Sequence, residues 1–265
     1  MELSLEKIKK DIKTKSYSEV PFAMKKSELV SAAESFLDFL TLPSETKEKY
    51  KTYADPLNMR AGEIGYFRRM QKSGSADDKE FFHYHEYTKE AFTDLLEDAD
   101  HKTKIFIDNA DKVFNASKKA MSQLLQTLEG DYPGIHDKFF KGKQHRRFFL
   151  RFLKYDSKKK GDFLAKGHYD KGTLTLAIAE SAPGLRLGRN DRTLIEVEHK
   201  ENTAFFMPAY NFSTVSSEEF FPTWHDVVQR GEDRVNNETS RWAIVFFTDA
   251  VDAETPTIEE THTQQ

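Results

Sequence analysis

The first half of the chain carries apolar residues at helical spacing. One stretch follows Ser27, a residue type that often caps helix N-termini, and stops at Pro43. Its apolar positions, three or four residues apart, are Leu29, Ala33, Phe36 and Leu40. A longer stretch of the same period covers 106–128 and stops at Gly130. The pattern predicts two amphipathic helices, each with one face packed against a sheet.

After Gly142 the pattern changes to short segments rich in Phe, Leu, Ile, Val and Thr, separated by Gly, Asn, Asp and Lys. The predicted strands are Arg147–Tyr155, Thr173–Ala179, Leu185–Val197, Thr203–Pro208, Trp224–Val228 and Arg241–Thr248. Within the second of these, Leu174, Leu176 and Ile178 share one face, which is typical of an antiparallel strand. Helices first and strands second favour a mainly β fold, a barrel or jelly roll with a helical buttress.

No internal repeat, Gly/Ser linker or break in composition divides the chain. We therefore expect a single domain over 1–265. Its parts would be a mostly helical segment over 1–140, a β core over 141–250 that carries the functional site, and a polar tail over 251–265.

Composition narrows the classes of function. The 265 residues include 40 Lys and Arg against 44 Asp and Glu, for a net charge of -4, which argues against a nucleic-acid partner. The longest apolar runs are strand-sized, well short of the ~20 residues of a membrane helix, and the N-terminus lacks the apolar core of a signal peptide. We therefore expect no membrane partner and, by default, a cytoplasmic location. The absence of cysteine leaves nitrogen and oxygen as the metal ligands.

Two tripeptides have the His-x-Asp/Glu pattern that holds non-heme iron together with a remote histidine. The tripeptide 199–201 lies in a run of charges typical of a solvated loop. The other, His168-Tyr169-Asp170, directly precedes the strand at 173–179. His225, on a later predicted strand, is the candidate third ligand. Arg241 opens the last predicted strand, where it could hold a carboxylate through its guanidinium.

The order of these motifs resembles the isopenicillin N synthase-like branch of the iron(II)- and 2-oxoglutarate-dependent oxygenases. The similar segments are GHYDKGTLTL over 167–176, GL at 184–185, HDVV over 225–228 and RWAIVFF over 241–247. Upstream, FLDFLTLPSETK over 36–47, GYF over 65–67 and DKEFFH over 78–83 are also similar to that family. The resemblance covers about residues 30–250.

The resemblance implies a double-stranded β-helix, or jelly roll, with iron(II) at its open end. It assigns the iron ligands to His168, Asp170 and His225. Arg241 would bind the distal carboxylate of 2-oxoglutarate, and Tyr155 would hydrogen-bond the same cosubstrate. The expected reaction is hydroxylation of an unactivated C–H bond in a small molecule, such as an amino acid or related metabolite, with O2 as co-reactant.

Two departures from the family pattern bear on the cosubstrate. Ala243 stands where the family usually has a serine, and the 16 residues from His225 to Arg241 exceed the usual interval. An iron oxidase of the isopenicillin N synthase type, independent of 2-oxoglutarate, is therefore one alternative. A binding module with a jelly-roll fold and no catalysis is another.

Substrate contacts are the least determined part of the site. Four residues are candidates for them: Arg68, Arg69, Phe82 and Tyr84. The residue pattern around His83 and His85 indicates ordinary strand histidines. The basic residues at 146, 147 and 151 indicate a solvated or ion-paired strand end.

Overall fold

The computed structural model describes residues 3–54, 62–70, 78–141, 148–216, 220–231, 235–236 and 238–250. Its helices are α1 (Leu5–Lys15), α2 (Lys26–Leu40), α3 (Ser44–Lys49), α4 (Thr88–Ala91), α5 (Thr93–Glu97), α6 (His101–Leu128), α7 (Ile135–Phe140) and the 3-10 turn η1 (Tyr210–Thr214). None of the helices in these ranges is both long and apolar enough to cross a membrane. The predicted tail over 251–265 lies outside the described residues.

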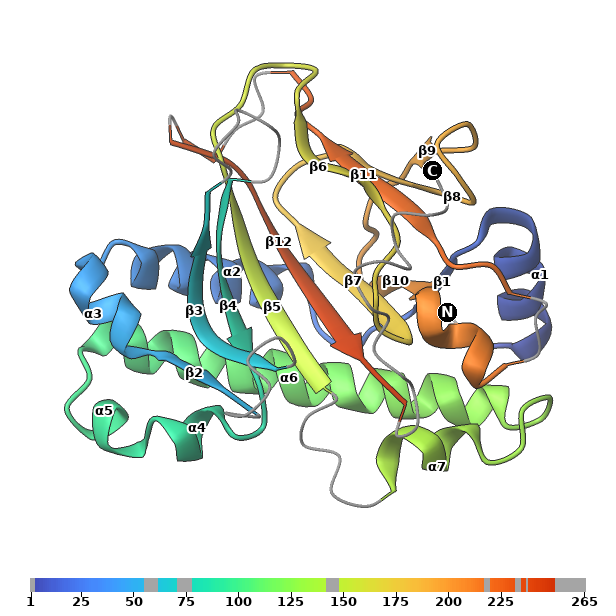
Figure 1. The fold of residues 1–265 in the computed structure, drawn as a ribbon, viewed down its shortest axis with the longest axis horizontal. Coiled ribbons are helices and arrows are strands. Elements are labelled where there is room, and N and C mark those ends of the chain that lie inside the picture. Colours follow the sequence, from blue (N-terminus) through green and yellow to red (C-terminus); the bar gives the residue numbers. More distant parts are fainter. Residues whose placement is uncertain are drawn as a thin grey trace.

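The strands form two antiparallel sheets (Figure 1). The eight-stranded sheet has the order β1-β10-β7-β12-β5-β4-β3-β2, and the four-stranded sheet has the order β6-β11-β8-β9. The strands are β1 (Ser18–Pro21), β2 (Lys51–Tyr53), β3 (Glu63–Arg69), β4 (Lys79–Tyr84), β5 (Phe148–Asp156), β6 (Phe163–His168), β7 (Leu174–Glu180), β8 (Leu185–Gly188), β9 (Ile195–Glu196), β10 (Thr203–Pro208), β11 (Trp224–Val228) and β12 (Thr239–Thr248). This architecture confirms the predicted mainly β jelly roll with a helical buttress.

The helical buttress consists mainly of α2 and α6, which pack on one face of the large sheet (Figure 1). Asp100 caps α6, because its side chain accepts hydrogen bonds from the backbone of Lys102 and Thr103. Helix α2 begins slightly earlier than predicted, because the Glu28 carboxylate accepts a hydrogen bond from the backbone N–H of Lys25 at 2.8 Å. The buried rings of Phe36, Phe39, Phe82, Phe106 and Phe152 join the helices to the sheet.

The large sheet also takes strands from the first half of the chain. The described part of segment 1–140 contains four strands in addition to the helices, and β4 pairs with β5 residue by residue from Lys79 to Tyr84. Residue 140 is therefore not a structural boundary. The expectation of strand histidines holds for His83, which lies in β4, whereas His85 directly follows that strand. The sequence KEFFHY of β4 has no regular alternation of polar and apolar residues, because both faces of the strand are buried.

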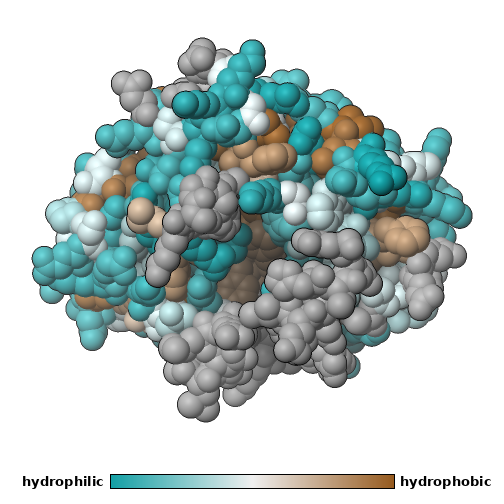
Figure 2. Space-filling model, turned by 45° about the horizontal axis from the view of Figure 1, so that its top comes forward, coloured by the Kyte–Doolittle hydropathy of each residue, from teal (hydrophilic) through white to brown (hydrophobic). Residues whose placement is uncertain are grey.

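A second core fills the space between the two sheets. It includes Phe81, Leu153 and Phe205 from the large sheet and Leu164, Leu187 and Val227 from the small one. A cavity opens in this space, lined by residues of both sheets. Seen with the top of Figure 1 turned forward, the surface is mainly hydrophilic around a hollow with hydrophobic walls (Figure 2).

Candidate active site

The pairing of two strands in the small sheet brings the predicted metal ligands together. His168 ends β6, and its register partner on β11 is His225. The two imidazole rings lie 4.3 Å apart between centroids. Asp170 follows β6 by two residues, so the chain turns its carboxylate back toward both rings. The register of the sheet therefore brings His225 next to His168 and Asp170, although His225 lies 55 residues after Asp170 in the sequence (225 − 170 = 55).

The three side chains have the geometry of a metal-binding cluster. Their ligand atoms all lie within 4.8 Å of one another. Asp170 Oδ1 is 3.9 Å from His168 Nε2 and 3.7 Å from His225 Nε2. Two imidazoles and a carboxylate suit a first-row transition metal such as iron(II), and three ligands from one side leave coordination positions for other groups.

Backbone carbonyls fix both histidines in the tautomer that metal binding requires. His168 Nδ1 lies 2.7 Å from the Lys166 carbonyl oxygen, and His225 Nδ1 lies 3.2 Å from that of Thr223. Each Nδ1–H therefore donates to a carbonyl, and each Nε2 keeps its lone pair for the cluster. Desolvation and the neighbouring His225 lower the pKa of His168 to about 4, so its ring is neutral at pH 7.

Asp170 is held in its ionised form. Burial alone would raise its pKa, but His225, His168 and the Thr175 hydroxyl together lower it. The hydroxyl donates to Asp170 Oδ2 at 2.7 Å. Thr175 belongs to β7 of the large sheet, which follows Asp170 in the chain. Its hydrogen bond fixes the orientation of the carboxylate and leaves Oδ1 facing the histidines.

Gly167 lets the two ligand strands approach closely. A Cβ atom at this position would lie 2.7 Å from the indole of Trp224, the residue that precedes His225. The glycine before one histidine therefore packs closely against the tryptophan before the other, and any side chain at position 167 would require Trp224 to move.

The metal cluster and the predicted cosubstrate residues share one cavity. Arg241 and Tyr155 line it together with His168, Asp170 and His225. Arg241 and Tyr155 are register partners on β12 and β5, and both are buried. The Arg241 Nε atom is buried without a hydrogen-bond partner among the described residues, so an anionic ligand in this cavity would satisfy it.

Glu180 is a residue of this cavity that the sequence reasoning missed. Its carboxylate forms an ion pair with Arg241 Nη2, while Arg241 Nη1 donates to the Pro183 carbonyl at 3.3 Å. The other Glu180 oxygen lies 3.3 Å from Nδ1 of His199. His199 was predicted to lie in a solvated loop, yet it lines the cavity and donates through Nε2 to the Ala177 carbonyl. That prediction is therefore wrong for His199.

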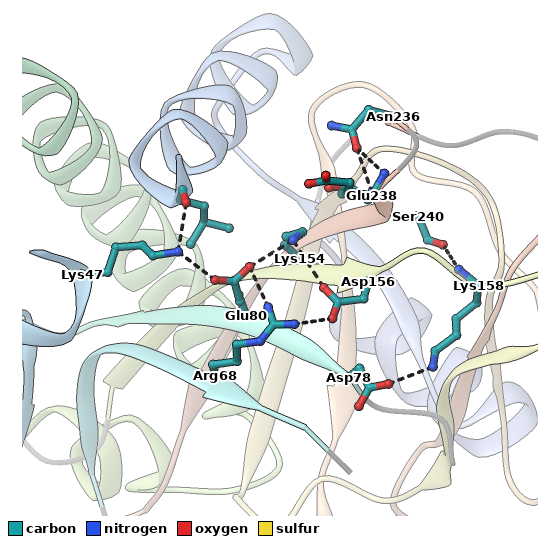
Figure 3. Close-up of polar contacts among 12 residues, drawn as sticks. Lys47, Arg68, Asp78, Glu80, Lys154, Asp156, Lys158, Asn236, Glu238 and Ser240 are labelled. Atoms are coloured by element: carbon teal, nitrogen blue, oxygen red, sulfur yellow. Dashed lines mark hydrogen bonds and ion pairs between the residues drawn. The ribbon is translucent and has the colours of Figure 1, made fainter. Parts of the chain in front are cut away.

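Three of the proposed substrate residues face away from the cavity. Arg68 pairs with Glu80 and Asp156 on the outer face of the large sheet, as Figure 3 shows. Phe82 packs against the α6 ring Phe106, and the hydroxyl of Tyr84 donates to Asp111 of the same helix. Side chains alternate along a strand, so these positions belong to the helix-facing side. The expectation that they contact substrate is corrected accordingly.

Arg69 lies on the same face of the sheet as the cavity but does not line it. Its guanidinium lies over the ring of Phe81 and its Nη2 donates to Glu63 at 3.1 Å. Arg151, by contrast, lines the cavity and donates to His83 at 2.7 Å. It is neither a solvated nor an ion-paired strand end within the described residues.

The overall fold is shared with several solved oxygenase structures. A full-length Neurospora crassa protein in complex with alpha-KG is 17% identical, with a TM-score of 0.69 over 97% of this chain and 83% of that one. JOX2 in complex with 2OG, Fe and JA is also 17% identical, with a TM-score of 0.69 over 98% of this chain and 75% of that one. The dioxygenase for auxin oxidation 1 of Arabidopsis thaliana, in complex with 2-oxoglutarate, is 18% identical, with a TM-score of 0.70 over 95% and 94%.

No protein-family model and no curated protein sequence matches the chain. The fold is nevertheless that of the 2-oxoglutarate- and iron(II)-dependent oxygenases, whose solved members it matches along nearly its whole length. The family resemblance drawn from the sequence is thereby confirmed at the level of the fold. The cluster of His168, Asp170 and His225, in the cavity between the two sheets, adds a candidate metal-binding donor set to that fold.

Proposed function

We propose that the protein is an iron(II)- and 2-oxoglutarate-dependent dioxygenase that hydroxylates an unactivated C–H bond of a small molecule, such as an amino acid or related metabolite. The observation that carries this proposal is the cavity that contains both the His168–Asp170–His225 cluster and the buried guanidinium of Arg241. Bound iron(II) and 2-oxoglutarate would together supply the electrons that activate O2 for oxidation of a C–H bond.

The residues of the chain would bind and orient these groups. The Nε2 atoms of His168 and His225 and the Oδ1 atom of Asp170 would be the metal donors. The other polar atom of each side chain, Nδ1 in the histidines and Oδ2 in Asp170, is held by a hydrogen bond. Arg241 Nε would meet the distal carboxylate of the cosubstrate, beside Tyr155. The apolar side chains of Leu153, Met207 and Val245 line the rest of the cavity and limit access of water.

Anaerobic titration of the iron(II)-loaded protein with 2-oxoglutarate tests this proposal. We expect a weak visible charge-transfer band to appear, and succinate to form once O2 is admitted. Asp170→Ala and His168→Ala should lose metal binding, measured by the thermal shift that Mn(II) induces. His101→Ala, an exposed residue outside the cavity, is the matched control. Unchanged metal binding in both ligand variants would overturn the ligand assignment.

The same titration distinguishes a second candidate, an iron oxidase that does not use 2-oxoglutarate. Two observations favour it: Ala243 lines the cavity without offering a hydroxyl, and Arg241 already has a carboxylate partner in Glu180. Iron binding without the visible band and without succinate would support this candidate. Absence of metal binding would support a jelly roll that binds ligands without catalysis.

A further inference from the structure

A second arginine lines the cavity in addition to Arg241. Arg151 reaches it from the centre of β5, on the same face of the sheet as Leu153 and Tyr155. No described acidic residue forms an ion pair with it, although its charge and that of Asp170 influence each other's pKa values. A half-buried guanidinium beside a metal cluster is costly unless something anionic pairs with it.

The surroundings of Arg151 hold its guanidinium in one orientation. Its Nε donates to His83 Nε2 at 2.7 Å, and His83 Nδ1 lies 2.9 Å from the Glu63 carbonyl oxygen. His83 is thus a neutral acceptor, since burial and the adjacent Arg151 lower its pKa well below the usual value. The guanidinium also lies between the rings of Phe81 and Phe247, 5.1 and 4.7 Å from their centroids.

In this arrangement one guanidinium nitrogen of Arg151 donates a hydrogen bond within the protein, and the other two remain available to a ligand. The histidine accepts from Nε and the two rings lie close to the guanidinium carbon, whereas the terminal nitrogens Nη1 and Nη2 have no hydrogen-bond partner among the described residues. Two parallel N–H donors in a fixed plane are the usual recognition element for a carboxylate.

The two described carboxylates that line the cavity are both engaged elsewhere. Glu180 forms its ion pair with Arg241, and Asp170 faces the two histidines and the Thr175 hydroxyl. Neither of them forms an ion pair with Arg151. An anionic group of a bound molecule would therefore supply the partner that the described side chains do not give this guanidinium.

We propose that Arg151 is the substrate-anchoring residue, that His83 positions it, and that the substrate is a small molecule with a carboxylate and an apolar body. The carboxylate pairs with the terminal nitrogens of Arg151. The body lies against the apolar wall formed by Val245 and Phe247, with its C–H bonds toward the metal cluster. This inference rests on the proposed function, and it extends it to the substrate class.

The test compares two molecules of the same shape, 4-methylpentanoate and 4-methylpentanamide. Their dissociation constants are measured by calorimetry on the protein loaded with Mn(II) and saturating 2-oxoglutarate, so that no turnover occurs. We expect the carboxylate to bind at least about tenfold more tightly than the amide. Equal binding of the two by the unaltered protein would overturn the proposal, whatever the variants do.

Variants of Arg151 and His83 show which side chains cause the preference for the carboxylate over the amide. Arg151→Gln should bring the two dissociation constants within about twofold of each other, whereas Arg192→Gln, an exposed arginine outside the cavity, should keep the difference. His83→Leu removes the acceptor for Arg151 and should reduce the preference, and His83→Gln, which keeps an acceptor, should restore most of it. A preference that survives Arg151→Gln would assign the carboxylate to another cation and overturn the role of Arg151.

The same comparison is made on the Mn(II) protein without 2-oxoglutarate. This arm distinguishes a failure of the proposed cosubstrate from a failure of the proposed substrate class. A protein that fails to bind 2-oxoglutarate but prefers the carboxylate through Arg151 would contradict the proposed cosubstrate and support the substrate class. A protein that binds 2-oxoglutarate but binds the carboxylate and the amide equally would support the proposed cosubstrate and contradict the substrate class.

Discussion

Arg241 and Glu180 form a buried ion pair in the wall of the cavity, with side chains 2% and 7% exposed. The guanidinium expected to bind the distal carboxylate of 2-oxoglutarate thus already has a carboxylate partner. The cosubstrate must therefore share Arg241 with Glu180, at the cost of placing two negative charges close together.

Glu180→Gln should strengthen the binding of 2-oxoglutarate. Glutamine keeps the shape and a carbonyl acceptor for Arg241, but it removes the competing negative charge. We expect the dissociation constant for 2-oxoglutarate, measured by the anaerobic visible titration, to fall by about five- to tenfold. Weaker binding would mean that the charge of Glu180 is needed to hold Arg241 in place.

Ala243→Ser should also strengthen that binding. Residue 243 lines the cavity two positions after Arg241, hence on the same face of β12. A hydroxyl there could donate to the distal carboxylate, for a gain of about 1 kcal/mol. The same titration should show about a fivefold lower dissociation constant, and Ala243→Val, which adds bulk without a donor, is the control that should show none.

Thr175→Val should weaken metal binding without removing a ligand. The valine is nearly isosteric but cannot donate to Asp170 Oδ2, so the carboxylate loses its orientation. A loss of about 10- to 100-fold in affinity for Mn(II) or iron(II) is expected, measured by competition with a chelating dye. Thr175→Ser keeps the hydroxyl and should remain within about threefold of the unaltered protein. Equal losses in both variants would argue for a packing role instead.

Gly167→Ala should destabilise the protein and its metal site together. The added methyl group would overlap the indole of Trp224, which pairs with Gly188 of β8 and packs against the ring of Tyr169. We expect a loss of about 1–3 kcal/mol in unfolding free energy, measured in urea, together with weaker metal binding. Trp224→Phe in the same chain should recover part of both losses, because the smaller ring makes room. Losses that simply add in the double variant would rule out this contact as their cause.

Glu80 should make stability depend on pH at the acidic end. Burial alone would raise its pKa, but Tyr66, Lys154 and Lys47 lower it to about 2; Figure 3 shows the lysines around it. A folded pKa below the unfolded value of 4.5 gives stability that is present above pH 4.5 and is lost as the pH falls toward 2.

We therefore expect Glu80→Gln to lower the unfolding free energy by about 2 kcal/mol at pH 7, after allowance for solvent screening. The difference from the unaltered protein, followed by urea unfolding, should shrink between about pH 5 and about pH 2.5. Glu198→Gln, at an exposed position, should show no such trend. A difference that stays constant with pH would assign the effect to packing.

The sequence alone indicated most of the local elements that form the site, and it singled out the candidate metal ligands. Helices α2 and α6 follow from the period of apolar residues, because each has one buried face. The apolar segments also predicted strands at the positions of β5, β7, β10, β11 and β12. Strand β6, which carries His168, was not predicted. The His-x-Asp tripeptide 168–170 and the distant His225 were recognisable because metal binding demands particular residue types in a fixed order.

Only the tertiary structure decided which other polar residues belong to the site. Arg68 and Arg69 are adjacent in sequence, yet the first faces the helices and the second faces the other side of the sheet. Glu180 and Arg151 carry no local signal, because the sequence around each is equally compatible with a solvated position. The tripeptide 199–201 was set aside because of the charged residues around it. Glu180 and Arg151 reach the cavity through the register of β7, β12 and β5, and His199 reaches it from the loop that follows β9. Register is a property of paired strands, which no single segment of sequence contains.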